Sequence, residues 1–173
     1  MEITLTDAAA LPDLVGAQAL AGFRGGPFPS SAVAAAADAI RAECGWHIAP
    51  VITQTARLRV EGDLLLLPSL RVLEVLAVAA PDGTAVPGWV WEGDAAVRMP
   101  SACRGPRVVD VTFRHGYLEC PPALLPALAE RAAAHTGGRI KQESLAGRSV
   151  SLEGGYDPTT SAAMDRHRLH WRP

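Results

Sequence analysis

Two histidines near the C-terminus have the spacing of metal ligands. His167 and His170 lie three positions apart in a segment expected to be helical, with Asp165 close by. Imidazole and carboxylate groups at such a spacing can hold a zinc ion. The histidines are interleaved with and followed by cations, namely Arg166, Arg168 and Arg172. Positive side chains repel a metal cation, so we expect a solvated basic tail here and no metal site.

Two other histidines lie where structural roles are expected. His47 follows Trp46 just past an expected helix end, where a structural hydrogen bond is favoured over general-base chemistry. His115 follows a strand directly, in a stretch expected to form a turn that closes a sheet. The sequence contains no G-x-x-x-x-G-K-[ST], G-x-G-x-x-G or G-x-S-x-G motif. We therefore predict that the protein is not an enzyme and has no catalytic, metal-binding or cofactor-binding residues.

The composition narrows the class of protein. A chain of 173 residues is long enough for one well-buried domain and short for two. The net charge of −2 argues against a protein that wraps nucleic acid, because neutralising phosphates needs a clear excess of Lys and Arg. Fifteen Arg, one Lys and no Asn are typical of a GC-rich gene, which points to a GC-rich bacterium or its phage.

The cysteines and the apolar stretches indicate in which cellular compartment the protein is expected. The three cysteines are odd in number and form no C-x-x-C pair, which favours reduced thiols in a cytosolic setting over a disulfide framework or zinc ribbon. These are Cys44, Cys103 and Cys120. The N-terminus has no basic region, so no signal peptide is expected. The most apolar stretch, 64–80, is interrupted by Pro68, Arg71 and Glu74, so we expect no membrane span.

Helical periodicity occurs before and after a central region of period two. A Thr6-Asp7 cap predicts a first helix ending before Gly22, and Ser30-Ser31 caps a second that runs to about Cys44, with Gly45 at the C′ position. A third is expected from Pro121-Pro122 to about 134 and a last from about 160 to 170. The predicted strands are 51–60, 64–67, 72–78, 85–91, 95–99 and 107–114, with a further possible strand at 149–152.

Short strands with tight turns favour antiparallel pairing, because parallel crossovers would need intervening helices. The predicted fold class is α+β, a single domain in which N-terminal and C-terminal helices frame an antiparallel β-rich insertion. Its parts are a helical segment 1–45, a β-rich segment 50–118, a helix at 121–136, a polar, Gly-rich extended arm or loop at 139–160, and a C-terminal helix and tail at 160–173.

The two ends of the chain differ in charge. Residues 1–23 carry three carboxylates and no Lys or Arg, whereas the last eight residues carry three Arg and two His. Opposite charges at the ends suit a head-to-tail contact between copies, or a tail that reaches a different partner. The same bias can also serve solubility alone.

Five stretches in register, spanning residues from about 30 to 169, resemble the head–tail connector (adaptor) family of long-tailed double-stranded DNA bacteriophages and gene transfer agents. They are 39–51 (AIRAECGWHIAPV), 64–72 (LLLLPSLRV), 111–117 (VTFRHGY) followed by Pro121-Pro122, 141–145 with 148–152 (KQESL and RSVSL), and 166–169 (RHRL). The first twenty-nine residues and the last three lie outside this resemblance.

The resemblance implies a virion structural protein at the head–tail interface, made in the bacterial host cytoplasm. Such a protein forms a homo-oligomeric ring, twelve-fold in the family, beneath the portal protein, and has no cofactor. Its further partners would be the next tail or stopper protein and double-stranded DNA, which passes through the lumen during genome ejection without sequence-specific binding. Arms of such subunits reach their neighbours, and the candidates for that contact are Arg139, Lys141, Glu143 and Arg148.

The C-terminal segment 160–173 is expected to dock on the portal. A short helix so near the terminus has little of its own domain to pack on, and helices this brief are marginal alone. Trp and Arg are also frequent carriers of interface energy. The portal-contact candidates are Met164, Arg166, Arg168, Leu169, Trp171 and Arg172. The alternative is that Met164 and Leu169 cover the protein's own helical core.

Other functions stay open on the residues alone. A tail-completion or stopper protein one layer further out belongs to the same class. A small nucleic-acid-binding module is disfavoured by the net charge. A small enzyme is disfavoured by the missing nucleophile, metal and phosphate motifs.

Overall fold

The structure, a computed structural model, describes residues 2–5, 11–60, 62–100, 107–136, 143–145, 148–150 and 158–170. The chain divides into two compact units that alternate along the sequence. One, the β unit, comprises 1–12, 45–119 and 169–173. The other, the helical unit, comprises 13–44 and 120–168. The sequence predicts one domain, and whether the two units act as one stays a prediction.

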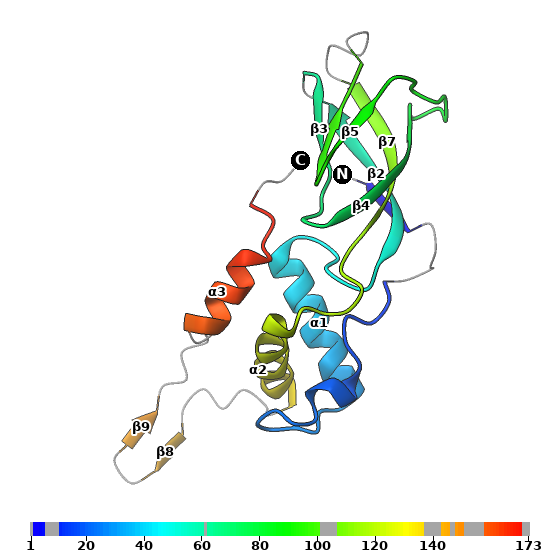
Figure 1. Ribbon diagram of the computed structural model, residues 1–173. Helices are drawn as coiled ribbons and strands as arrows, with labels where there is room; N and C mark the ends of the chain where they lie inside the picture. The colour runs from blue at the N-terminus through cyan, green and yellow to red at the C-terminus, as the bar shows by residue number, and fades with distance from the viewer. Residues whose placement is uncertain are drawn as a thin grey trace. The chain divides into compact units, whose positions relative to one another are not determined.

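The β unit contains two antiparallel sheets (Figure 1). The four-stranded sheet has the order β1-β2-β7-β4, and the three-stranded sheet has the order β3-β6-β5. The strands are β1 (Glu2–Leu5), β2 (Ile52–Val60), β3 (Leu64–Leu66), β4 (Val72–Ala79), β5 (Val90–Gly93), β6 (Ala96–Arg98) and β7 (Arg107–His115). The long β2–β7 ladder runs in unbroken register from Ile52 opposite His115 to Val60 opposite Arg107.

Side chains from both sheets form one apolar core. Alternation along β2 buries Ala56, Leu58 and Val60, as period two requires of a strand with one covered face. The largest side chain of this core is Phe113 on β7, which is fully buried. Burial of a side chain of this size stabilises a fold by about 1.5–3 kcal/mol, so these positions hold the two sheets together.

The helical unit is built on α1 (Ser30–Cys44) and α2 (Leu125–Thr136). The buried stripe of α1 recurs at helical spacing: Ala32, Val33, Ala36, Ala37, Ile40 and Cys44. Gly45 follows with φ +80°, as a C′ glycine that ends a helix should. A 3-10 turn, η3 (Pro122–Leu124), leads into α2, because proline is tolerated where a helix begins. The last helix is α3 (Pro158–Arg166).

The α+β class predicted from the sequence is confirmed, with α1 before and α2 after the run of strands β2 to β7. The first predicted helix is wrong over the residues the structure describes. Glu2–Leu5 is strand β1, paired antiparallel with β2, and the only helical turn before Gly22 in the described residues is η1 (Ala17–Leu20). Alternating polar and β-branched or apolar residues favour a strand at 2–5, while Pro12 and Gly16 disfavour a continuous helix.

Two further boundaries differ from the prediction. The strand expected at 85–91 begins only at Val90, after Pro87 and a Gly88 with φ +80°, and a single bridge joins Ala79 to Ala85. Pro cannot donate to a ladder, so pairing stops there. The last helix ends at Arg166 rather than near 170.

The segment expected to form an extended arm contains a short hairpin. Strand β8 (Glu143–Leu145) pairs antiparallel with β9 (Arg148–Val150), and Glu143 stands opposite Val150. The strand expected at 149–152 overlaps β9. Two of the arm candidates, Glu143 and Arg148, lie in this hairpin, whereas Arg139 and Lys141 lie outside the described residues.

Candidate functional site

Two buried histidines lie side by side in the β unit. The ring centroids of His47 and His115 are 5.7 Å apart, and Phe113 stacks at a tilt on His115. His47 Nε2 donates a hydrogen bond to the carbonyl oxygen of Pro50, the structural role expected for it. Neither ring nitrogen of His115, a fully buried residue, has a hydrogen-bond partner among the described residues. Burial, and secondarily the proximity of His47, lower the pKa of His115 to about 3, so it is neutral at physiological pH.

The C-terminal histidines are not grouped as metal ligands. Nδ1 of His167 lies 2.8 Å from the carbonyl oxygen of Ala163, one turn earlier, and so is committed to the backbone. Asp165 forms an ion pair with Arg168 at 3.1 Å. Within the described part of the chain no three His, Cys, Asp or Glu residues come together in a way that could hold a metal ion.

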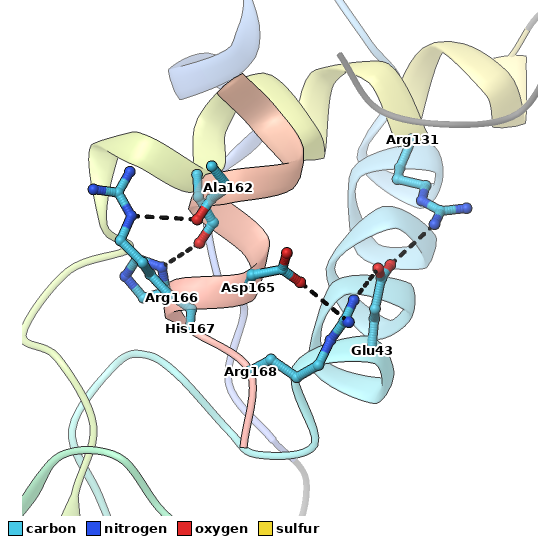
Figure 2. Close-up of polar contacts among 8 residues, drawn as sticks. Glu43, Arg131, Ala162, Asp165, Arg166, His167 and Arg168 are labelled. Atoms are coloured by element: carbon cyan, nitrogen blue, oxygen red, sulfur yellow. Dashed lines mark hydrogen bonds and ion pairs between the residues drawn. The ribbon is translucent and has the colours of Figure 1, made fainter. Parts of the chain in front are cut away.

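A carboxylate at the end of α1 connects three helices of the helical unit (Figure 2). The two oxygens of Glu43 accept hydrogen bonds from Arg131 on α2 at 3.0 Å and from Arg168, just past α3, at 2.8 Å. Arg168 also reaches Asp165, so four charged groups form one network. The network fixes the end of α3 to α1 and α2.

Replacing Glu43 with glutamine is expected to lower the free energy of unfolding by about 1 kcal/mol. The change removes the charge that both arginines pair with, and partly exposed pairs contribute about 0.2–1 kcal/mol each. Chemical denaturation measures the loss, which should shrink at high salt. The matched control is Glu74→Gln, whose pair with Arg114 is longer, at 3.5 Å, and half-exposed on both sides. An equal loss in the control would show that the Glu43 network adds nothing special.

The structure places the portal-contact candidates in different surroundings. Met164 is buried in the helical unit, where α3 packs on η3 and α2, and Leu169 is buried in the β unit. Arg168 is held by Glu43, and Arg166 is exposed. Trp171 and Arg172 lie outside the described residues. The expectation that this helix has little of its own domain to pack on is wrong, because Thr160, Ala163 and Met164 form a buried face on α3.

The described thiols are free and shielded. Burial raises the pKa of Cys44 to about 12 and that of Cys120 to about 11. Such groups remain protonated near neutral pH and are poor nucleophiles. Cys103 lies outside the described residues.

An unusual strand edge lies at β4, one of the two outer strands of the four-stranded sheet. The buried valines of β4 recur every three residues, whereas their partners on β7 recur every two. Val72 stands opposite His115, Val75 opposite Phe113 and Val78 opposite Val111. Two bulges take up the additional residues, and the register skips Leu73 and Leu76. Both leucines are exposed, at 37% and 45%. The bulges therefore direct apolar side chains into solvent.

A pocket of about 320 Å³ lies at the start of this edge. Its lining combines apolar and cationic groups: Val51, Arg71, Leu73, Arg114, Gly116, Tyr117 and Leu118. Leu118 is 81% exposed, and the guanidinium carbon of Arg71 stands 5.9 Å from the centre of the Tyr117 ring. None of the residues predicted from the sequence to make contacts lies on this surface. The available signals were the three-residue spacing of valines at 72, 75 and 78 and an apolar Leu118 beside a turn.

No helix in the described part of the chain combines the length and apolar character that a bilayer crossing needs. Three features of the described residues are chemically distinctive: the cationic and apolar lining near β4, the Glu43 network and the buried histidine pair. The surface at β4 combines a pocket with exposed apolar and cationic side chains.

Comparison with solved structures finds this fold in the neck of gene transfer agent (GTA) particles. A chain from the neck of an empty GTA particle with C6 symmetry aligns at a TM-score of 0.66 and 20% identity, covering 100% of both chains. A chain from the neck of a native GTA particle with C12 symmetry aligns at a TM-score of 0.64 and 20% identity, again covering 100% of both. No family model and no curated protein matches the sequence. The likeness establishes a shared fold over the full length.

Proposed function

We propose that this chain is a structural subunit of the neck of a phage-like particle, and that it forms a ring between the portal and the tail. The observation that carries the proposal is the full-length match of its fold to neck chains of GTA particles. Neck structures with C12 and C6 symmetry favour a homo-oligomeric ring, and the proposed number of copies is twelve. The ring leaves a lumen through which double-stranded DNA passes.

A non-catalytic role agrees with the chemistry of the described residues. Two buried histidines are neighbours there: the ring nitrogens of His115 have no hydrogen-bond partner among the described residues, and the ring of His47 is bonded to a backbone carbonyl. Burial raises the pKa of both described thiols, so they stay protonated near neutral pH. We infer that the protein acts through its surfaces in the virion, at the head–tail interface, after synthesis in the host cytoplasm.

Two surfaces are proposed for contacts within the neck. The C-terminal tail contacts the portal through Arg166, which is exposed, together with Trp171 and Arg172. Burial of Met164 and Leu169 removes them from this proposed surface. The segment that holds the β8–β9 hairpin contacts a neighbouring subunit, with Arg139, Lys141, Glu143 and Arg148 as the proposed contact residues.

The test is assembly of the full-length chain with the portal ring of the same particle. Mass photometry and electron microscopy are expected to show a twelve-copy ring of this protein stacked on the portal. Binding only to a portal that already carries another neck protein would support the stopper role one layer further out. A chain that stays monomeric with the portal and with the tail components would overturn the proposal. Tight binding to a DNA fragment at physiological salt would instead favour a nucleic-acid-binding module.

A further inference from the structure

We propose that the β4 edge surface, formed by Arg71, Leu73, Arg114 and Leu118, binds the N-terminal segment 11–13 of a second copy of this chain. The proposal rests on the ring-forming function above and names the surfaces through which adjacent copies meet. Four observations of the described residues carry it: a sheet edge with no strand paired to it, outward leucines, a cation without an ion-pair partner among them, and an acidic, apolar segment elsewhere in the same chain.

The β4 edge is open over most of its length. Hydrogen bonds from Val86 to Val78 and from Ala80 to Thr84 occupy the far end of the edge. Among the described residues no strand pairs with the outer side of 72–77. Exposed edges with apolar side chains attract further chains, and proteins normally blunt them with charge or cover them. In β4 the bulges leave apolar side chains uncovered at the edge, because they place Leu73 and Leu76 outside the pairing with β7.

The β4 edge surface has an excess of positive charge, which favours an acidic partner. Arg114 pairs with Glu74 at 3.5 Å, and both groups are about half-exposed. Arg71 forms no ion pair with another described residue, and its guanidinium lies against Tyr117. The surface thus carries two cations against one carboxylate, beside the exposed Leu118. A segment with an apolar side chain and a carboxylate close together is complementary to it.

The chain offers such a segment before η1. Leu11 is 46% exposed, Asp13 is exposed, and residues 11–13 have no regular secondary structure. Asp13 forms no ion pair with another described residue, although it attracts the more distant Arg41. Two positions along an extended chain span about 7 Å, which suits one side chain in the pocket and one carboxylate at its rim. The first cation of the chain is Arg24, so nothing in the segment itself repels Arg71.

A second copy is the occupant that this pair of surfaces favours. A ring needs a heterologous interface, in which each copy presents two different and complementary surfaces. This chain carries both the cationic, apolar surface and the acidic, apolar segment. Contact between them in successive copies propagates head to tail and closes when the rotation per copy allows.

Charge exchange tests the pairing in the full-length chain. Arg71→Glu and Asp13→Arg are each expected to raise the concentration needed for half-assembly, on the portal ring where the portal is required, at least tenfold. The double variant, with the charges exchanged, is expected to return within threefold of the original chain. The matched controls are Arg59→Glu, at an exposed position on β2, and Asp38→Arg, at an exposed position on α1. Circular dichroism and thermal melting confirm that each variant is folded.

A photo-crosslinker at Leu118 gives an independent readout. With mixed isotope-labelled copies, the crosslinked peptide is expected to contain residues 11–13 of the other copy. Normal assembly of both single variants would overturn this inference and leave the proposed ring intact. Loss of assembly without rescue by the exchange, or a crosslink to another peptide, would also reject the Asp13 partner. Failure of the original chain to form rings under any condition would instead reject the proposed function.

Discussion

Replacing Met164 with alanine is expected to lower the free energy of unfolding of the helical unit by about 2–5 kcal/mol. Met164 is 1% exposed and lies on the face of α3 that packs on η3 and α2. Truncation leaves a cavity there in addition to the lost apolar transfer energy. Chemical denaturation followed by circular dichroism measures the effect.

The control for this substitution lies two residues along the same helix. Arg166 is exposed, so Arg166→Ala is expected to change stability by less than about 0.5 kcal/mol. If Arg166 belongs to the portal contact, the same variant binds portal rings more weakly. The opposite pattern, with Met164→Ala fully stable yet unable to join the portal, would restore the hypothesis that Met164 belongs to a docking arm.

The second large effect is expected on acidification. The pKa of His115 is about 3 in the folded protein, because burial disfavours its charged form, and 6.5 in the unfolded chain. Between these values the unfolded state binds the additional proton, so stability falls as pH falls, by about 1.4 kcal/mol per pH unit. The whole contribution amounts to about 5 kcal/mol, complete near pH 3.

His115→Phe tests this origin of the acid sensitivity. The substitution keeps a ring next to Phe113 and removes the titrating group, so the slope between pH 6.5 and 4.5 should flatten. This window avoids Asp110, whose pKa is lowered by the hydrogen bond from Arg57 and whose contribution is lost only at more acidic pH. A slope equally steep in His115→Phe would place the sensitivity elsewhere.

Local patterns were sufficient to predict most elements. The α1 stripe, its Ser30-Ser31 start and its Gly45 end follow from helical period and capping chemistry, which depend on residues close in sequence. The β2 and β7 strands follow from period two. The predicted helix over the first twenty residues failed because a few apolar residues at loose spacing outweighed the short strand pattern at 2–5.

The bulged register of β4 could not be predicted from residues close in sequence. Valines at 72, 75 and 78 are visible in the sequence, but period three belongs to neither a regular helix nor a regular strand. Only pairing with β7 reveals that each additional residue is accommodated as a bulge and that Leu73 and Leu76 are turned outward. The candidate surface at this edge therefore could not be read from composition or motifs.

The sequence by itself determined the α+β class, the central run of antiparallel strands and the lack of a recognisable catalytic motif, because these depend on residue type and short-range spacing. The tertiary structure decided which side chains are available to partners. It buried Met164 and Leu169, tied Arg168 to Glu43 across 125 positions of sequence, and left Arg71 and Leu118 at an open edge. Exposure is a property of long-range packing, since the same side chain can lie in a core or at an interface according to what folds against it.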